Sequence, residues 1–276
     1  MFKLSDLLWD KVAPMLSFSF LFPIFLLTTI VHEVGHGIIA LALGGEVIAI
    51  EIYQDAAFIH AHFDTQPNAV GYSIFVLGGI LAQYALGLLT LVAVRKLRPK
   101  KFLLRSLTLW VIMQNLIAPS MSLGSLQGDS YNFATTLANA SGIEVIPILM
   151  QVSASLLVLV TFYICERETE AFLRNVFHWL KSTRIRVIAT LTVTSYIVIS
   201  VIYFFAKFSY PLYFLVIALG ITTLSLTVPS KLSLEGKTAQ INQNFSLRDL
   251  VFSSILFISI SAFFLFATPF FISPYI

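Results

Sequence analysis

Long apolar stretches dominate this chain and limit what it can fold into. An α-helix needs about 20 mostly apolar residues to cross about 30 Å of hydrocarbon. Seven stretches of this kind are separated by polar or charged breaks: Met15–Leu43, Val70–Val94, Phe102–Pro119, Val145–Cys165, Val187–Phe205, Tyr210–Val228 and Leu250–Phe271. The sequence therefore predicts an all-α polytopic membrane protein with about seven transmembrane helices.

The composition excludes several other classes of protein. Hydrophobic residues make up 58% of the chain and charged residues 11%, whereas a soluble domain has about 45–50% and about 25%. A soluble domain, a disordered chain and a disulfide scaffold are therefore excluded. Because Cys165 is the single cysteine, a metal would have to be bound by His, Asp or Glu.

Basic residues gather in alternate connections between the apolar stretches. Lys and Arg lie before the first stretch, at 95–105, at 167–186 and at 231–248, and only Lys207 lies in the other set of connections. Because positively charged loops are retained in the cytoplasm, we expect a multi-pass integral membrane protein with its N-terminus cytoplasmic and its C-terminus outside. The lipid bilayer is its expected environment, and no nucleic-acid partner is expected.

The segment Glu166–Arg186, after the fourth stretch, has two interpretations. Its apolar residues recur at helical spacing opposite Arg167, Arg174 and Lys181, which suits a helix lying on the inner membrane surface. The alternative is a solvated charged connector that only sets the topology.

The first apolar stretch contains the motif His32-Glu33-Val34-Gly35-His36. Ionisable residues inside a span are costly, so they are candidates for function. On a helix the i, i+4 spacing puts both imidazoles on one face, where they can bind one Zn²⁺ while Glu33 acts as general base. Buried polar packing without a metal is the alternative.

A catalytic zinc has three protein ligands and one open position, so the two histidines need a third partner. From the residues alone the candidates on the same side of the membrane are Asp129, His60, His62 and Asp64. Asp129 precedes a short helical pattern, so a helix N-cap is its alternative role.

A β-hairpin is expected between the first two spans. Glu46–Ile52 and Phe58–Phe63 are rich in β-branched and aromatic residues and flank a Gln54–Asp55 turn. Irregular backbone at membrane depth is tolerated only where protein or a wet cavity covers it, so this small hairpin would be membrane-associated. His60 and His62 share one face of the second strand. They are interpreted as access-modulating residues, ligands of a second metal, or simple interfacial polar residues.

Two side-chain amides, Gln83 and Asn115, lie inside apolar stretches. They are candidates for binding the substrate backbone or a developing oxyanion, which needs donors fixed in a low-dielectric site. The alternative is an interhelical hydrogen bond, which is common in membrane bundles. Small residues expected to allow close helix packing are Gly37, Ala40 and Gly44 on the first span and Gly79 and Gly87 on the second.

Three motifs within residues 15–142 occur in the order seen in a known family. The first is His32–Gly37 followed by Leu43–Glu46, the second is Gly78–Gln83, and the third is Asn115–Pro119 followed by Gly128–Asp129. Together they resemble the site-2-protease type of intramembrane zinc metalloprotease. Gln83 stands where that family usually has Asn, and the separation from Asn115 to Asp129 is longer than usual.

The resemblance implies a fold and an activity. Residues 1–142 would form a three-span zinc peptidase core with the hairpin, and residues 143–276 a four-span helical region of unknown role. His32, His36 and Asp129 would bind Zn²⁺, and Glu33 would be the catalytic base. The enzyme would hydrolyse peptide bonds in or near transmembrane segments of membrane proteins, with the hairpin edge pairing with an unwound substrate strand.

Two other functions stay open at this point. One is a seven-span zinc-dependent lipid amide or ester hydrolase, because His32 and His36 also satisfy the HxxxH pattern of the ceramidase-like group; lipid turnover would favour it. The other is a catalytically silent relative that binds membrane proteins or carries a solute. The intact Glu33 argues against the silent relative, and zinc binding without hydrolysis would favour it.

Overall fold

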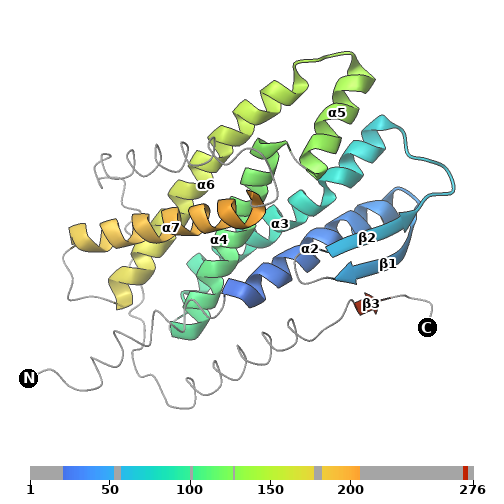
Figure 1. Cartoon of the computed structure of the whole chain (residues 1–276). Coiled ribbons are helices and arrows are strands. Elements are labelled where there is room, and N and C mark those ends of the chain that lie inside the picture. Colours follow the sequence, from blue (N-terminus) through green and yellow to red (C-terminus); the bar gives the residue numbers. More distant parts are fainter. Residues whose placement is uncertain are drawn as a thin grey trace, which may run out of the picture.

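The computed structural model describes residues 21–52, 57–99, 102–126, 128–176, 182–205 and 270–272. These residues form a mostly helical protein with one small sheet (Figure 1). In chain order the elements are α2 (Leu21–Ala42), β1 (Glu46–Ile52), β2 (Ala57–His62), α3 (Ala69–Leu97), α4 (Phe102–Ser125), α5 (Asp129–Ser141), α6 (Ile146–Val176), α7 (Ser182–Phe205) and β3 (Phe270–Ile272).

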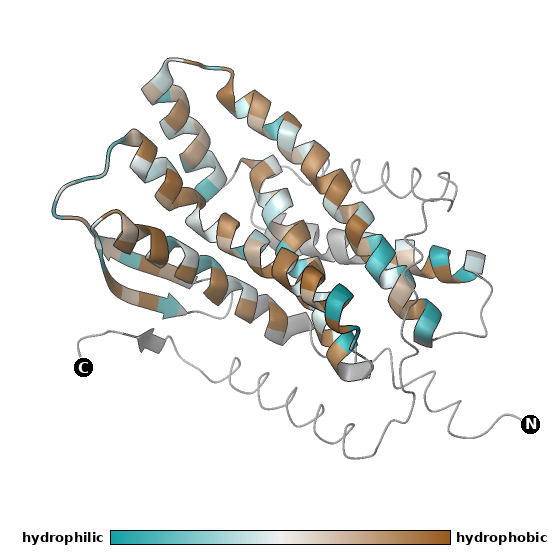
Figure 2. Ribbon diagram, turned by 180° about the vertical axis from the view of Figure 1, so that it is seen from behind, coloured by the Kyte–Doolittle hydropathy of each residue, from teal (hydrophilic) through white to brown (hydrophobic). Residues whose placement is uncertain are grey.

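Three of these helices are long and apolar enough to cross a membrane: Ala69–Leu97, Leu104–Gly124 and Ile146–Asn175. They match the second, third and fourth predicted spans. Apolar residues run along the helices in Figure 2. In α2 the described apolar segment, Leu27–Ala42, is shorter. Together with the composition, these helices support an integral membrane protein.

The later spans of the seven-span prediction are tested only in part. The fifth predicted stretch is helical as α7. Tyr210–Val228 and most of Leu250–Phe271 lie outside the described residues. The end of the seventh predicted span is wrong, because Phe270 and Phe271 are in strand β3. Pro269 immediately precedes them, and its missing N–H and fixed φ disfavour a helix through this point.

Helix α4 is the centre of the described bundle. Within its apolar segment 72% of the residues are buried, against 39% in α3 and 28% in α6. Met113 and Ile117 of α4 are fully buried and belong to one hydrophobic core with residues of α2, α3, α6 and α7. The core therefore includes residues from both predicted regions, 1–142 and 143–276, and that division stays a prediction.

Helix α6 is longer than the sequence predicts. The predicted span ends at Cys165, but the helix continues to Val176, so a separate interfacial helix at Glu166–Arg186 is wrong over its first half. Residues 177–181 lie outside the described part. The acidic residues that suggested a solvated connector are buried in α6.

Each of these buried carboxylates has a partner, which offsets the cost of taking its charge out of water. Glu168 accepts hydrogen bonds from Arg95 Nε at 2.9 Å and from Arg105 Nη2 at 3.0 Å. Glu166 accepts one from Thr190 Oγ1 at 2.7 Å, and Glu170 is paired with two arginines of α6. A hydropathy window cannot detect such pairs, since their partners are distant in sequence or one helical turn away.

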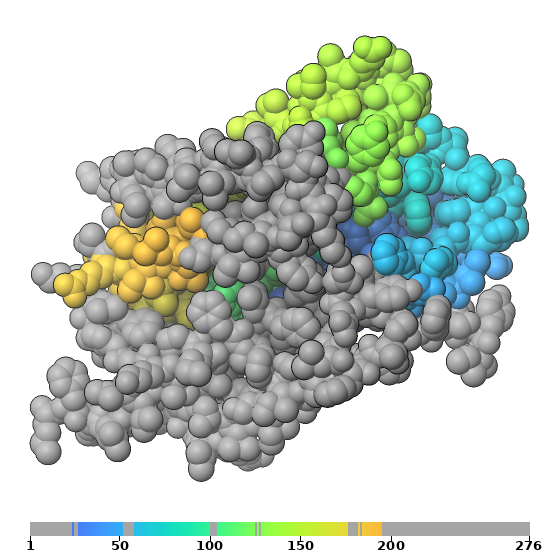
Figure 3. Space-filling model, in the orientation of Figure 1, coloured from blue at the N-terminus to red at the C-terminus, as the bar shows by residue number. Residues whose placement is uncertain are grey.

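The predicted hairpin is confirmed. Strand β1 covers the predicted Glu46–Ile52, and β2 begins and ends one residue before the predicted Phe58–Phe63. The strands are antiparallel, with a bulge between Val47 and Ala49, and the predicted turn at residues 54–55 lies outside the described part. The hairpin and the start of α3 lie on the same flank of the molecule as α5 (Figure 3).

A third strand completes the sheet. Strand β3 pairs antiparallel with β1, with Ile50 opposite Ile272 and Ile52 opposite Phe270, so the strand order is β2-β1-β3. It was not predicted, because the pairing joins segments more than 200 residues apart and depends on the tertiary fold.

Candidate metal centre

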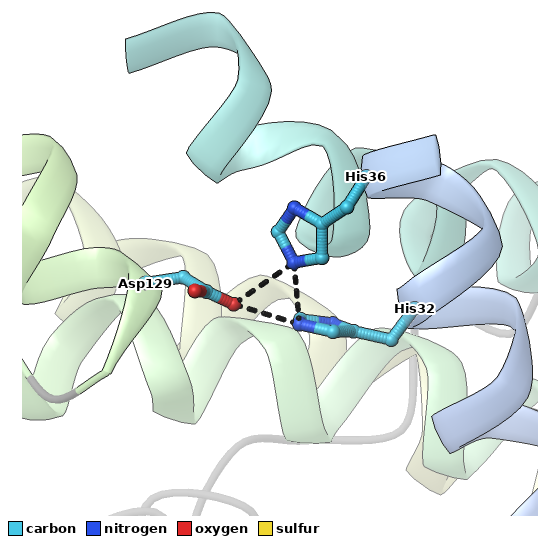
Figure 4. Close-up of side chains that lie close together, drawn as sticks. All are labelled: His32, His36 and Asp129. Carbon is cyan, nitrogen blue, oxygen red and sulfur yellow. Dashed lines mark hydrogen bonds and ion pairs between the residues drawn. The ribbon is translucent and has the colours of Figure 1, made fainter. Parts of the chain in front are cut away.

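The two histidines of the motif lie on one face of α2, as their i, i+4 spacing predicts. The Nε2 atoms of His32 and His36 are 3.1 Å apart. Both rings point away from α2 toward the start of α5 (Figure 4). One helix turn therefore presents two potential metal ligands side by side.

Asp129, the first residue of α5, completes the cluster. Its Oδ2 lies 2.7 Å from His32 Nε2 and 3.1 Å from His36 Nε2 (Figure 4). A tetrahedral zinc with Zn–N bonds of about 2.0–2.1 Å would separate its ligand atoms by about 3.3 Å. Within the described part of the chain this is the one group of three potential metal ligands. Two imidazoles and a carboxylate at this spacing fit a catalytic zinc.

A hydrogen bond on the far side of the His36 ring orients it for metal binding. His36 Nδ1 lies 2.8 Å from the carbonyl oxygen of Phe75 on α3. Because a carbonyl can only accept, Nδ1 carries the proton and the Nε2 lone pair is available to an ion. Helix α3 thereby fixes both the tautomer and the direction of this ligand.

Glycines at the crossing of α2 and α3 let His32 reach the cluster. The backbones of Gly35 and Gly78 touch, since a Cβ on Gly78 would lie 2.7 Å from Gly35 O. A Cβ on Gly79 would lie 2.6 Å from three atoms of the His32 ring. The imidazole therefore occupies the space that any other side chain at position 79 would fill.

The electrostatics of Asp129 suit a metal ligand. Burial alone would raise the pKa of its carboxyl, but hydrogen bonds with His32 and His36 hold that pKa well below its usual range. Gly128 is the N-cap residue of α5, so the alternative N-cap role of Asp129 is wrong. Its charge at the first turn is also favoured by the helix dipole.

Glu33 lies beside the cluster. Its side chain is only 8% exposed, and its carboxylate is within electrostatic reach of His32, His36 and Asp129. The backbone N–H of Ile59, on strand β2, donates to it. The predicted base is therefore near the ligands and held by the hairpin.

The rival ligands on and after the hairpin are not part of this cluster. His60 Nε2 lies 3.3 Å from Glu51 Oε1, and His62 Nε2 lies 3.4 Å from Asp64 Oδ1. Both histidine side chains are more than half exposed. In the described ranges none of the three rivals joins a metal-binding group, which favours the interpretation of the histidines as interfacial polar residues.

Asn115 is fully buried and bonded to α2. Its Nδ2 donates to Thr28 Oγ1 at 3.0 Å and to Val111 O at 2.9 Å. Its Oδ1 has no partner among the described residues. Thr28, one turn before His32, was missed by sequence reasoning, although its i, i+4 relation to His32 puts it on the metal-binding face. The interhelical hydrogen bond is therefore formed, and the amide oxygen stays available.

Gln83 follows Gly79 by one helical turn on α3 and is buried. Within the described part of the chain no hydrogen bond holds its side chain, and it does not belong to the metal-binding group. Its predicted contact with a substrate stays a prediction.

The first half of the chain is similar to a known protein family. A Peptidase M50B-like family model matches residues 8–127. Over this range, which is less than half of the chain, the sequence is similar to the site-2 protease family. The match contains His32, Glu33 and His36 and ends two residues before Asp129, so the evidence for Asp129 is the geometry itself. No curated protein and no solved structure matches the chain.

The contact between Gly79 and His32 generates a first prediction. Gly79→Ala should lower zinc affinity strongly, because the new methyl group displaces the His32 ring. Zinc content after dialysis against a metal buffer measures the effect. Gly124→Ala is the matched control, since its Cβ would meet Ala154 at an ordinary 3.7 Å, and it should retain zinc. Equal zinc content in both variants would contradict the proposed packing of the His32 ring against Gly79.

The geometry of Asp129 generates a second prediction. Asp129→Asn removes the charge while retaining the shape, so zinc affinity should fall strongly, because two imidazoles and a neutral amide bind zinc poorly. His60→Ala and His62→Ala should leave zinc content unchanged. Metal analysis of the purified variants shows which of the three residues is the third ligand. An Asp129→Asn protein with full zinc content would reject Asp129.

Proposed function

We propose that this chain is an intramembrane zinc metalloendopeptidase that hydrolyses peptide bonds in or near transmembrane segments of membrane proteins. The observation that carries the proposal is the convergence of His32, His36 and Asp129 beside a buried Glu33. The match of residues 8–127 to a Peptidase M50B-like family model supports it. It also favours a peptidase over the lipid hydrolase and the silent relative.

The protein residues have separate roles in this chemistry. His32 and His36 would bind zinc through Nε2, and Asp129 through a carboxylate oxygen. When bound, the ion acts as a Lewis acid that polarises the scissile carbonyl and makes water a better nucleophile. Glu33 takes a proton from the attacking water and returns it to the leaving amine. Because Glu33 is buried, bulk water is excluded from around it, and its electrostatic interactions with the attacking water and the leaving amine are stronger.

The proposed substrate is a transmembrane or membrane-anchored segment that is locally unwound at the site. A helix hides its peptide carbonyls in its own hydrogen bonds, so Glu33 and the ligands can act only on an extended stretch. The hairpin offers strand backbone on the same flank as the ligands. Strand pairing would replace the hydrogen bonds that an unwound substrate loses.

Asn115 and Gln83 are proposed substrate contacts. Both hydrogens of the Asn115 amide are directed at Thr28 and Val111, so Asn115 cannot also donate to an oxyanion. Its Oδ1 can accept an N–H from the substrate backbone. A buried acceptor without a partner costs about 1–3 kcal/mol, so a hydrogen bond from a substrate N–H to Asn115 Oδ1 would be favourable. The amide of Gln83, without a described partner, can serve a peptide group as donor or acceptor.

The role of Glu33 is tested by Glu33→Gln. The variant should bind zinc stoichiometrically and lose hydrolysis of a membrane-protein substrate by about 100-fold or more, because the amide cannot take a proton. Zinc analysis and cleavage assays on the same preparation measure both quantities. Glu144→Gln, at an exposed position, is the control and should behave as wild type. Near wild-type cleavage by Glu33→Gln would contradict the role of Glu33 as general base.

The orientation is also proposed, on the basis of the basic connections. The N-terminus would be cytoplasmic and the C-terminus outside, so the hairpin would face outward. Single cysteines at Gln66 and Asn68, both exposed, should react with a membrane-impermeant reagent on intact cells, and one at Lys100 should not. Cys165 is fully buried and gives little background. The opposite labelling pattern would invert the topology.

A further inference from the structure

Strand β2 packs directly on the turn of α2 that carries Glu33 and His36. Ile59 is the contact residue: a Cβ on Gly37 would lie 2.8 Å from Ile59 Cδ1 and 3.4 Å from Val47 Cγ2. Gly37 therefore leaves room for the hairpin to lie against the helix. Strand β2 and helix α2 lie side by side along this contact (Figure 1).

Strand β2 has one edge that no other described strand pairs with. In the sheet order β2-β1-β3 one edge of β2 is used by β1, and β3 lies beyond β1. In an antiparallel pair the N–H groups of alternate residues point toward the neighbouring strand and away from it. Ile59 is opposite Ile50, and its N–H donates to Glu33, so this donor belongs to the outward-facing set.

We infer that Ile59 is a positioning residue for the catalytic base, acting through its backbone N–H. This inference rests on the proposed function and adds a role for the hairpin beyond pairing with substrate. A glutamate on a helix can rotate about three side-chain bonds. A fixed donor on one carboxylate oxygen limits that rotation and leaves the other oxygen for proton transfer.

The backbone of a strand is well suited to this task. The backbone at Ile59 is held by the pairing with β1 and by the contact of its side chain with Gly37. It is therefore preorganised, and misplacing a catalytic group by about 1 Å can cost about 100-fold in rate. A side-chain donor would need to be ordered at each turnover.

Ile59→Pro tests the inference, because it removes the one N–H and leaves the ladder with β1 intact. Proline is tolerated in an edge strand where the N–H points away from the ladder. We expect kcat to fall about 10- to 100-fold, with KM and zinc content unchanged. Ile59→Val, which keeps the N–H, should remain close to wild type.

Ala57→Pro is the matched control. Ala57 is two residues from Ile59 on β2, and its N–H has the same outward direction, but it is not bonded to Glu33 in the described structure. An equal fall in kcat in both proline variants would assign the effect to the strand as a whole. A rise in KM with kcat unchanged would assign the N–H to substrate binding. Either result would overturn the inference.

Hydrogen exchange at the Ile59 amide tests the contact without any activity measurement. The amide should be protected in wild type and in Glu33→Gln, whose carbonyl still accepts, and should exchange at least 10-fold faster in Glu33→Leu. Unchanged protection in Glu33→Leu would reject the contact. If wild type hydrolyses no peptide, the proposed function fails, and the exchange rates still decide whether β2 holds the Glu33 side chain.

Discussion

The site depends on one close contact between two helix backbones. Gly35 of α2 and Gly78 of α3 touch without intervening side chains, and Gly79 leaves the space that the His32 ring fills. Small residues permit such approaches in membranes, where no hydrophobic force draws helices together. At the same crossing, Phe75 of α3 binds the His36 ring, and α5 packs on α3. The helix contact therefore brings all three ligands to one point.

Buried charged residues far from the ligands also join helices of the bundle. Glu168 accepts hydrogen bonds from Arg95, near the end of α3, and from Arg105, near the start of α4. This pairing ties α6 to α3 and α4. A carboxylate in such a position costs free energy unless it is paired and hydrogen-bonded. The polar residues of α6 thus serve cohesion of the bundle, whereas those of α2 gather around a metal.

Local patterns predicted the parts of the site that local geometry controls. The spacing of His32 and His36 determines their common face on any helix, and β-branched residues in Glu46–Ile52 mark a strand. Asp129 could be proposed only among several candidates, because 97 and 93 residues separate it from the two histidines. Thr28 was missed, since a threonine in an apolar helix has no distinctive pattern. The continuation of α6 past Cys165 was missed because its acidic residues look solvated until their partners are known.

The third strand has a consequence for the order in which the protein is made. Strands β1 and β2 form a two-stranded ribbon that packs on α2 and is synthesised directly after it. Its outer edge is then unpaired, and unpaired edges invite association with other chains. Residues 270–272 are synthesised more than 200 residues later and cover that edge at Ile50–Ile52. Until these residues are made, the edge of β1 at Ile50–Ile52 has no strand to cover it and is open to pairing with another chain.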